Sequence, residues 1–301
     1  MTASTRPTSL HAALRLLCAA LFLFLLAAQG AQAAPAPLVL GRDAAKVDAW
    51  PALTVLLDEG AKLDAQGALA ANGRYEAPGL AHGVLKLVQD PHWMRIPLRV
   101  APDAPGDWVV EIDYAILDYV EFYLVQDGQP RKLASSGRRL EETGALKGRV
   151  PATALKLRPG ADYTLLVRVD AKGPRIAPLS FMQPDAFHQA SLREQMIQGL
   201  LLGIAACLLA YSLGQWVSIR EAIYLKYAMY VGGLALYGMV WFGIGEQFLW
   251  RGEVWFSRHV MGLSSMIAAT GAYLFVEGVL ARPGRDRRFS IVMESGARLW
   301  A

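Results

Sequence analysis

Cysteine is scarce in this chain: only Cys18 and Cys207 occur among its 301 residues. The long stretch between them contains none, so it can form neither a disulfide nor a cysteine-ligated zinc site. Cys18 does not fit a lipoprotein site, because Leu17 before it is not small and the apolar run follows the cysteine instead of preceding it. A domain between the two cysteines must therefore be stabilised by its hydrophobic core.

Motifs of catalysis are also missing. The sequence has no Gly-rich phosphate loop, no Ser or Cys nucleophile motif and no His or Cys pair at metal-ligand spacing. Two acidic pairs, Glu111/Asp113 and Glu141/Glu142, are typical of solvated charges on a strand face or loop. We therefore expect no enzymatic activity, no cofactor and no metal site.

The positive charge of the chain is not spread over a folded surface. The formal net charge is +4, yet residues 34–191 hold 18 basic against 19 acidic side chains. The excess lies near the two ends, where five arginines follow Ala281 against two acids, and Arg6 and Arg15 lie near the start. Basic residues beside apolar segments indicate membrane orientation, so we expect no nucleic-acid partner.

Long hydrophobic runs account for the apolar character of the chain. Hydrophobic residues make up 54% of it and the mean hydropathy is +0.27. The runs at residues 196–217, 222–244 and 260–281 are separated by short polar loops, and each is long enough to cross a bilayer core of about 30 Å as a helix. The sequence predicts three transmembrane helices and a partner in the lipid bilayer.

The first 33 residues have the features of a secretory signal peptide. Arg6 and Arg15 precede an apolar run at residues 16–28, and Ala31-Gln32-Ala33 is a small-x-small cleavage site. We expect cleavage after Ala33. An uncleaved anchor helix is the alternative.

Between the signal and the helices lies a predicted domain at residues 34–184, and from residue 50 to residue 181 its sequence alternates with a period of two. The segments at 93–100, 108–116 and 163–170 each place apolar residues on one face and charged residues on the other. Alternation of this kind is typical of antiparallel strands with one buried face. Short strands separated by turn signals such as Asp127-Gly128 predict an all-β periplasmic sandwich, specifically a jelly roll, followed by an α-helical transmembrane bundle.

The charges of the loops predict the orientation of the spans. Arg220 follows the first span, and further arginines at 282, 285, 287 and 288 follow the third, whereas the loop at residues 245–259 is balanced. The positive-inside tendency makes the basic side cytoplasmic. We therefore expect a multi-pass protein of the bacterial inner membrane with a periplasmic N-terminal domain and a cytoplasmic C-terminus.

Two further predictions concern the helices. Asp185 can cap a helix at residues 185–195 that runs directly into the first span as a stiff junction, although this segment could equally be a simple tether. Glu277 lies near the cytoplasmic end of the third span, where we expect it to reach the interface or pair with a tail arginine instead of relaying protons.

Several segments, taken in order, resemble one known family. They are residues 54–60 (TVLLDEG), 92–100 (HWMRIPLRV), 108–124 (WVVEIDYAILDYVEFYL), 165–173 (LLVRVDAKG), 179–187 (LSFMQPDAF), 224–250 (YLKYAMYVGGLALYGMVWFGIGEQFLW) and 275–280 (FVEGVL), which ends the third predicted span. This set resembles the type 2 extracellular domain and the first three membrane helices of bacterial seven-transmembrane receptors with diverse intracellular signalling modules (7TMR-DISM). The resemblance implies a jelly roll akin to carbohydrate-binding modules, and an output module of diguanylate cyclase or histidine kinase type.

A sandwich recognises sugars through aromatic faces and nearby charged groups. The residues on strand faces or strand ends that fit this description are Trp93, Arg95, Arg99, Trp108, Asp118, Tyr119 and Tyr123. Tyr123 shares a face with Glu121 and is the aromatic expected to be exposed. The alternative for Trp93 and Trp108 is that they pack in the core or at an edge.

These observations favour the sensory portion of a signal-transduction receptor. In this hypothesis the sandwich binds a small ligand such as a carbohydrate and changes how the membrane helices pack. The membrane helices could also mediate homo-oligomer formation. One alternative is a membrane-anchored scaffold that binds an envelope protein. Another is a tethered enzyme that acts on envelope glycans. The sequence contains no recognisable output module.

The tail at residues 282–301 turns apolar again after its arginines. We expect it to be a cytoplasmic loop leading toward a fourth span, which would make the chain a fragment of a longer receptor. The alternative is a three-span protein whose tail lies on the membrane surface as a basic amphipathic segment.

Overall fold

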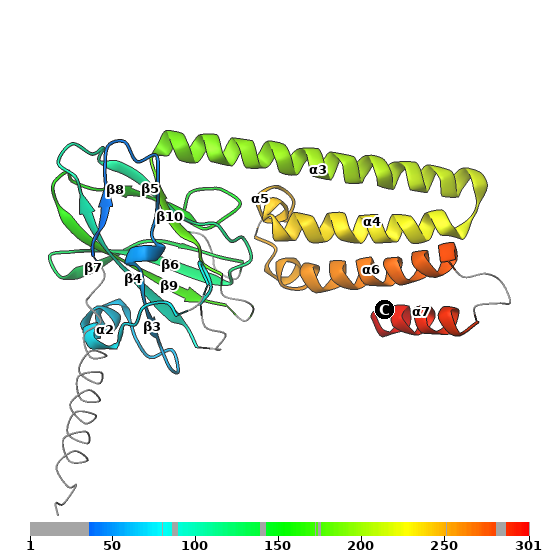
Figure 1. Ribbon diagram of the computed structural model, residues 1–301, viewed down its shortest axis with the longest axis horizontal. Helices are drawn as coiled ribbons and strands as arrows, with labels where there is room; N and C mark the ends of the chain where they lie inside the picture. The colour runs from blue at the N-terminus through cyan, green and yellow to red at the C-terminus, as the bar shows by residue number, and fades with distance from the viewer. Residues whose placement is uncertain are drawn as a thin grey trace, which may run out of the picture. The chain divides into compact units, whose positions relative to one another are not determined.

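The computed structural model describes residues 36–300 except 80, 86–89, 139–142, 172, 174–175, 251 and 281–286. The predicted signal peptide, the acids Glu141 and Glu142, and the tail arginines Arg282 and Arg285 lie outside the described residues. Within the unit formed by residues 37–301, a β-sandwich is followed by a group of long helices (Figure 1).

Six strands form the larger sheet. They are β1 (Leu38–Leu40), β3 (Thr54–Leu57), β4 (His92–Val100), β6 (Tyr119–Gln126), β7 (Gln129–Ser136) and β9 (Asp162–Asp170). The strand order is β1-β4-β9-β6-β7, and β3 pairs with the part of β4 that β1 leaves open. All pairs are antiparallel except β1 with β4.

The second sheet has four strands in the order β2-β10-β5-β8, and all of its pairs are antiparallel. These strands are β2 (Lys46–Asp48), β10 (Leu179–Met182), β5 (Asp107–Ile112) and β8 (Ala152–Lys156). Two facing sheets followed by helices confirm the predicted fold class. The finer assignment to a jelly roll stays a prediction.

The main core lies between the sheets and follows the period-two pattern. On β4, Met94, Ile96 and Leu98 are at most 1% exposed, and from the other strands Trp108 and Phe122 are fully buried with them. Burying each such side chain stabilises the fold by about 1.5–3 kcal/mol. The period-two pattern therefore identifies correctly which strand residues face the inside of the sandwich.

A second, smaller core covers the outer face of the larger sheet. The short helix α2 (Ala65–Ala70) lies over this face, and its Ala68 packs with Trp93, Val125 and Leu166. Asp64 caps α2, because its side chain accepts a hydrogen bond of 2.7 Å from the backbone N–H of Gly67. Strand β4 is consequently buried on both faces over its first half. Two 3₁₀ turns, η1 (Trp50–Ala52) and η2 (Asn72–Arg74), complete this part of the chain.

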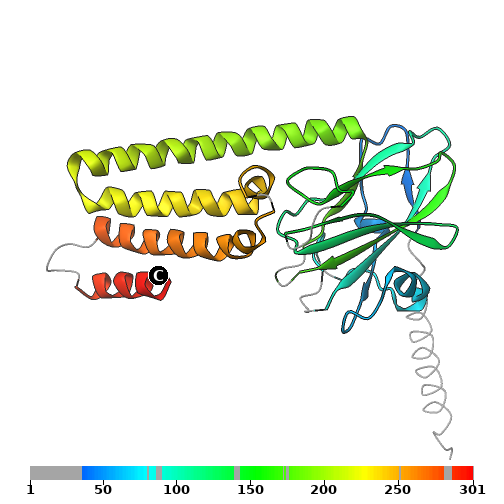
Figure 2. The same cartoon turned by 180° about the vertical axis from the view of Figure 1, so that it is seen from behind.

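In the described part of the chain, five helices follow the sandwich: α3 (Pro184–Ile219), α4 (Ala222–Trp241), α5 (Ile244–Phe248), α6 (Val254–Leu280) and α7 (Arg287–Trp300). Seen from behind in Figure 2, α4 lies between α3 and α6, and α7 lies beside α6. Small residues bring α4 and α6 close together. A Cβ on Gly233 would lie 2.5 Å from the backbone nitrogen of Ala268, and one on Gly271 would lie 2.5 Å from that of Tyr230.

Helix α3 runs without a break from the end of the sandwich through the first predicted span. The prediction that Asp185 caps it was wrong, because the helix begins one residue earlier with Pro184 at its first position and Gln183 as its N-cap. The fixed φ of proline suits this position, and the carboxylate of Asp185 in the first turn favours the positive end of the helix dipole.

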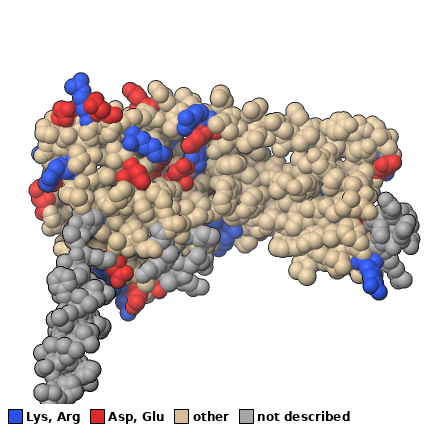
Figure 3. Space-filling view, viewed as in Figure 1, with Lys and Arg blue, Asp and Glu red and all other residues tan. Residues whose placement is uncertain are grey.

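Two helices in the described part of the chain are long and apolar enough to cross a membrane by length and composition, α3 and α6. The intervening α4 has 20 residues and ends at Trp241, three residues before the predicted end of its span. On the face shown in Figure 3, charged side chains of the described residues gather over the sandwich and at the far end of the helices, and very few lie between.

The partner of Glu277 differs from the prediction. Its carboxylate accepts hydrogen bonds from Lys226 Nζ on α4 at 3.0 Å and from Ser290 Oγ on α7 at 2.8 Å. Among the described residues, the cation beside Glu277 is therefore a lysine of the neighbouring helix and not a tail arginine. The ion pair links α4 to α6.

Candidate functional site

The structure brings three of the seven predicted ligand-binding residues together on the outer face of the larger sheet. Across β6, β9 and β4, Tyr123 is in register with Leu166, and Leu166 with Arg95. Trp93 precedes Arg95 by two residues, and its ring centroid lies 5.7 Å from that of Tyr123. The guanidinium of Arg95 donates to Asn72 and lies 5.6 Å above the ring of Tyr75.

This cluster lies beneath α2 and is largely covered. Trp93 is 1% exposed, and its indole N–H donates to Asp58 Oδ2 at 3.4 Å. Tyr123, expected to be exposed, is half-buried and donates from its hydroxyl to Glu121 at 3.1 Å. Burial, and then the charge of Glu121, raise the pKa of Tyr123 to about 12. A sugar could stack on Trp93 only after α2 had moved.

The remaining predicted residues are dispersed. Trp108 is fully buried between the sheets and donates from its indole N–H to the carbonyl of Pro105 at 2.9 Å. Arg99 forms an exposed ion pair with Asp162 at 2.9 Å. Asp118 is buried against Arg138, and Tyr119 beside it is 38% exposed. Ligand binding by any of the seven stays a prediction.

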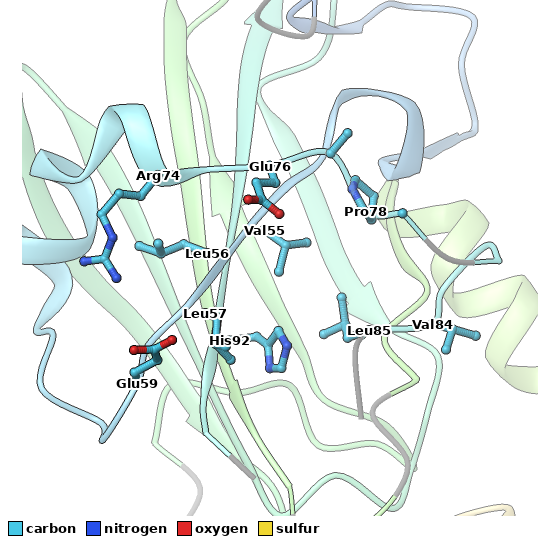
Figure 4. Close-up of a pocket in the computed structure, with 12 residues that line it drawn as sticks. Val55, Leu56, Leu57, Glu59, Arg74, Glu76, Pro78, Val84, Leu85 and His92 are labelled. Carbon is cyan, nitrogen blue, oxygen red and sulfur yellow. The ribbon is translucent and has the colours of Figure 1, made fainter. Parts of the chain in front are cut away.

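A cavity of about 340 Å³ opens elsewhere, beside the edge strand β3 (Figure 4). Its lining is Val55, Leu56, Leu57, Glu59, Arg74, Glu76, Ala77, Pro78, Gly79, Val84, Leu85 and His92. The backbone of Glu76 is bound to Val55 by two hydrogen bonds, of 2.8 and 3.0 Å, which hold the segment after η2 along β3. In Figure 4 Arg74 and Glu59 lie at one side of the cavity and His92 lies near Leu85.

This cavity has the character of a small-molecule site, because it combines an apolar floor with a few polar groups and its volume lies in the range of about 300–1,000 Å³. Glu59, Arg74 and Glu76 are exposed, whereas His92 is buried. Sequence reasoning missed all of these residues. Glu59, Arg74 and Glu76 lie in the segments that follow the edge strand β3, and His92 is the first residue of the interior strand β4. None of the four is a tryptophan or tyrosine, so no aromatic stacking signal marked them.

A second feature lies where the sandwich meets the helices. Residues 113–118, which we call the docking loop, follow β5 and contact the ends of α4 and α6. Ile116 packs against Val240, Trp250 and Val260, and the ring of Tyr114 meets that of Trp241 edge-on at 6.1 Å. The prediction of a strand through residue 116 was wrong, since β5 ends at Ile112.

Gly243 makes the contact between sandwich and helices unusually close. It has φ of +76°, and a Cβ at this position would lie 2.3 Å from the carbonyl oxygen of Arg149 and 2.8 Å from the Cβ of Ala115. Only glycine fits both the conformation and the space. The turn between α4 and α5 therefore lies directly against the sandwich.

Two arginines join the sandwich to the helices by polar contacts. Arg149 donates from Nε to Glu194 on α3 at 2.8 Å and from Nη2 to Asp113 of the docking loop. Burial lowers its pKa, but the two carboxylates outweigh that effect and raise it. Arg138 donates to Asp118 and to the carbonyl oxygen of Ser257 on α6, both at 3.3 Å.

Comparison with known families accounts for both parts of this architecture. Residues 51–183 match the family model described as 7TMR-DISM extracellular 2, and residues 194–296 match that described as 7TM diverse intracellular signalling. The chain belongs to the 7TMR-DISM family. It is therefore a membrane sensory receptor whose sandwich is the extracellular domain, as the resemblance of its segments predicted.

Other comparisons add little. No curated protein matches the chain. Among the 17 similar chains of solved structures is a glycosyl hydrolase family 2 member from Bacteroides cellulosilyticus DSM 14838, with 14% identity and a TM-score of 0.29. The match covers 46% of this chain and 20% of that one, so the 7TMR-DISM chain aligns with only a fifth of the hydrolase. A similarity this low indicates nothing about the function of the receptor.

Proposed function

We propose that this chain is the sensory portion of a bacterial inner-membrane receptor and is not itself an enzyme. In this proposal the periplasmic sandwich binds a small ligand, such as a carbohydrate, in the cavity beside β3. The binding changes how the sandwich rests on the membrane helices. The signal then reaches a cytoplasmic output module, of diguanylate cyclase or histidine kinase type, that residues 1–301 do not contain.

The observation that carries the proposal is the double contact of Arg149. One guanidinium contacts Asp113 of the sandwich and Glu194 of α3, so a shift of the docking loop changes the ion pair on the helix. A scaffold that only binds a partner protein needs no ion pair between the sandwich and α3. The arrangement therefore favours a receptor over the scaffold.

Ligand binding is tested first on the cavity. We expect Arg74→Ala to weaken binding of a cognate sugar by about 1.5–3 kcal/mol, because a charged hydrogen-bond donor is removed from the cavity wall. The purified full chain would be screened against a glycan library by thermal shift, and the affinity of each hit measured by calorimetry. Arg131→Ala, an exposed arginine of β7 outside the cavity lining, is the matched control.

Equal affinities of Arg74→Ala and the wild-type chain would remove the cavity from consideration. Conversion of a glycan to product would indicate the tethered enzyme instead. Capture of one envelope protein, with no glycan bound, would indicate the scaffold.

Membrane topology is tested separately. We propose three spans, since α3 and α6 are apolar and the 20 residues of α4 reach about 30 Å as a helix. Reporter fusions joined after Phe181 or within residues 245–259 should be periplasmic, and fusions after Arg220 or Arg288 should be cytoplasmic. A periplasmic reporter at Arg288 would contradict the three-span arrangement.

A further inference from the structure

A second cavity, of about 640 Å³, lies at the contact between the sandwich and the helices. From the sandwich it is lined by Arg138, Lys147 and Arg149, and from the helical part by Glu246 and Ser257. It is larger than the cavity beside β3 and is separate from it, since the two share no lining residue. Its lining holds three cationic side chains and one carboxylate, and three carboxylates outside the lining, Asp118, Asp113 and Glu194, pair with two of these cations.

The cations differ in how far their hydrogen-bonding capacity is already used. Arg149 is engaged by Asp113 and Glu194. Arg138 binds Asp118 and the carbonyl of Ser257 through its terminal nitrogens, while its buried Nε–H makes no hydrogen bond with the described residues. Each terminal nitrogen carries a second N–H, and these two groups are the donors of Arg138 that remain for a further acceptor.

Lys147 supplies the second open donor. Its side chain is exposed at the cavity wall, and no ion pair joins it to the described residues. A lining that combines guanidinium N–H groups with an ammonium group matches an oxyanion with several acceptor oxygens. We propose that this cavity binds a phosphate-bearing group, with Arg138 and Lys147 as its donors.

The place of the cavity suggests where such a group comes from. The cavity is bounded by Val254 and Ser257 at the start of α6, close to the exposed Trp255. In the proposed receptor topology this end of α6 lies at the outer interface, at the level of lipid headgroups. The phosphate could therefore belong to an anionic lipid or to a soluble compound. Only the source of the phosphate rests on the proposed function; phosphate binding itself does not.

A bound phosphate would also strengthen the contact between the two parts. Arg138 already reaches the carbonyl of Ser257, so an anion beside it adds contacts across the same interface. Anything that binds only the docked state stabilises it by mass action. We therefore expect phosphate compounds to raise the melting temperature of the full chain.

The test uses the detergent-purified full chain, titrated with inorganic phosphate and followed by calorimetry and thermal unfolding. Lys147→Glu should weaken phosphate binding by about tenfold or more, because an attraction becomes a repulsion, and Arg138→Gln should do the same. Arg131→Glu is the control, since it makes the same charge change near the opposite end of β7 from Ser136. Lys147 is exposed, so its variant will fold even if the Arg138 variant does not.

The source is tested with full chain reconstituted in phosphatidylcholine vesicles, with and without phosphatidylglycerol. Stabilisation by phosphatidylglycerol that Lys147→Glu abolishes would assign the site to a lipid headgroup, and stabilisation by inorganic phosphate alone would assign it to a soluble compound. No binding of either probe, or equal binding by wild type and Lys147→Glu, would overturn the proposal. Because phosphate binding in detergent does not depend on the number of spans, failure of the reporter fusions would leave this site standing.

Discussion

Replacing Trp108 with alanine is expected to lower the free energy of unfolding of the sandwich by about 3–5 kcal/mol. The indole is fully buried between the two sheets, and its N–H donates to the carbonyl of Pro105. The substitution leaves a large cavity in the main core and an unpaired carbonyl. Denaturant unfolding of the full chain, followed by the circular dichroism of its strands, measures the loss.

Tyr119→Ala is the matched control for this experiment. Tyr119 is an aromatic residue of the same sandwich but is 38% exposed, so its loss should change stability by less than about 0.5 kcal/mol. A loss below about 1 kcal/mol for Trp108→Ala would contradict its assignment to the core. The predicted role of Trp108 in ligand binding would then need a fresh test.

Gly243→Ala is expected to release the docking loop from the helices. The left-handed conformation costs a residue other than glycine about 1–3 kcal/mol, and here the added methyl group also meets the carbonyl of Arg149 and the Cβ of Ala115. The turn between α4 and α5 must therefore move away from the sandwich. Hydrogen exchange of the amides at residues 113–118 and 243–250 should become faster.

Gly252→Ala separates the cost of the left-handed conformation from the effect of the steric collision. Gly252 has φ of +80°, close to that of Gly243, but a Cβ there would meet nothing within 4 Å. It carries the conformational cost without the collision, so exchange in the docking loop should stay at the wild-type rate. Equal acceleration in both variants would show that the close contact at Gly243 does not hold the loop.

The sequence predicted the inner faces of the strands well, because alternation reflects burial on one side. It could not predict that Trp93 is buried on the other face, since that depends on α2, a six-residue helix too short for a periodic signal. The wrong prediction of a strand through residue 116 also arose because contacts distant in sequence leave no local pattern. Tyr114 and Ile116 continue the alternation of β5, but in the structure they follow the strand and pack both on the main core and against helices more than a hundred residues later.

The candidate sites were still harder to predict. The ion pair of Arg149 with Glu194 joins residues 45 positions apart, and a hydrogen bond from Arg138 reaches a carbonyl oxygen 119 positions away. No local pattern encodes such distances. Residues such as Arg74 and Lys147 look like ordinary surface charges until the fold places them beside a cavity.

The unbroken course of α3 would let this helix act as a lever in the proposed receptor. Its 36 residues, at about 1.5 Å each, extend about 54 Å, which exceeds the bilayer core of about 30 Å by several turns. Glu194 lies about three turns after the first residue of this helix, and Arg220 directly follows its last residue. A tilt of about 5° at the sandwich would displace the far end by about 5 Å, roughly the pitch of one helical turn. In the proposed receptor, a small movement where a ligand binds would thus become a larger displacement at the far end of α3.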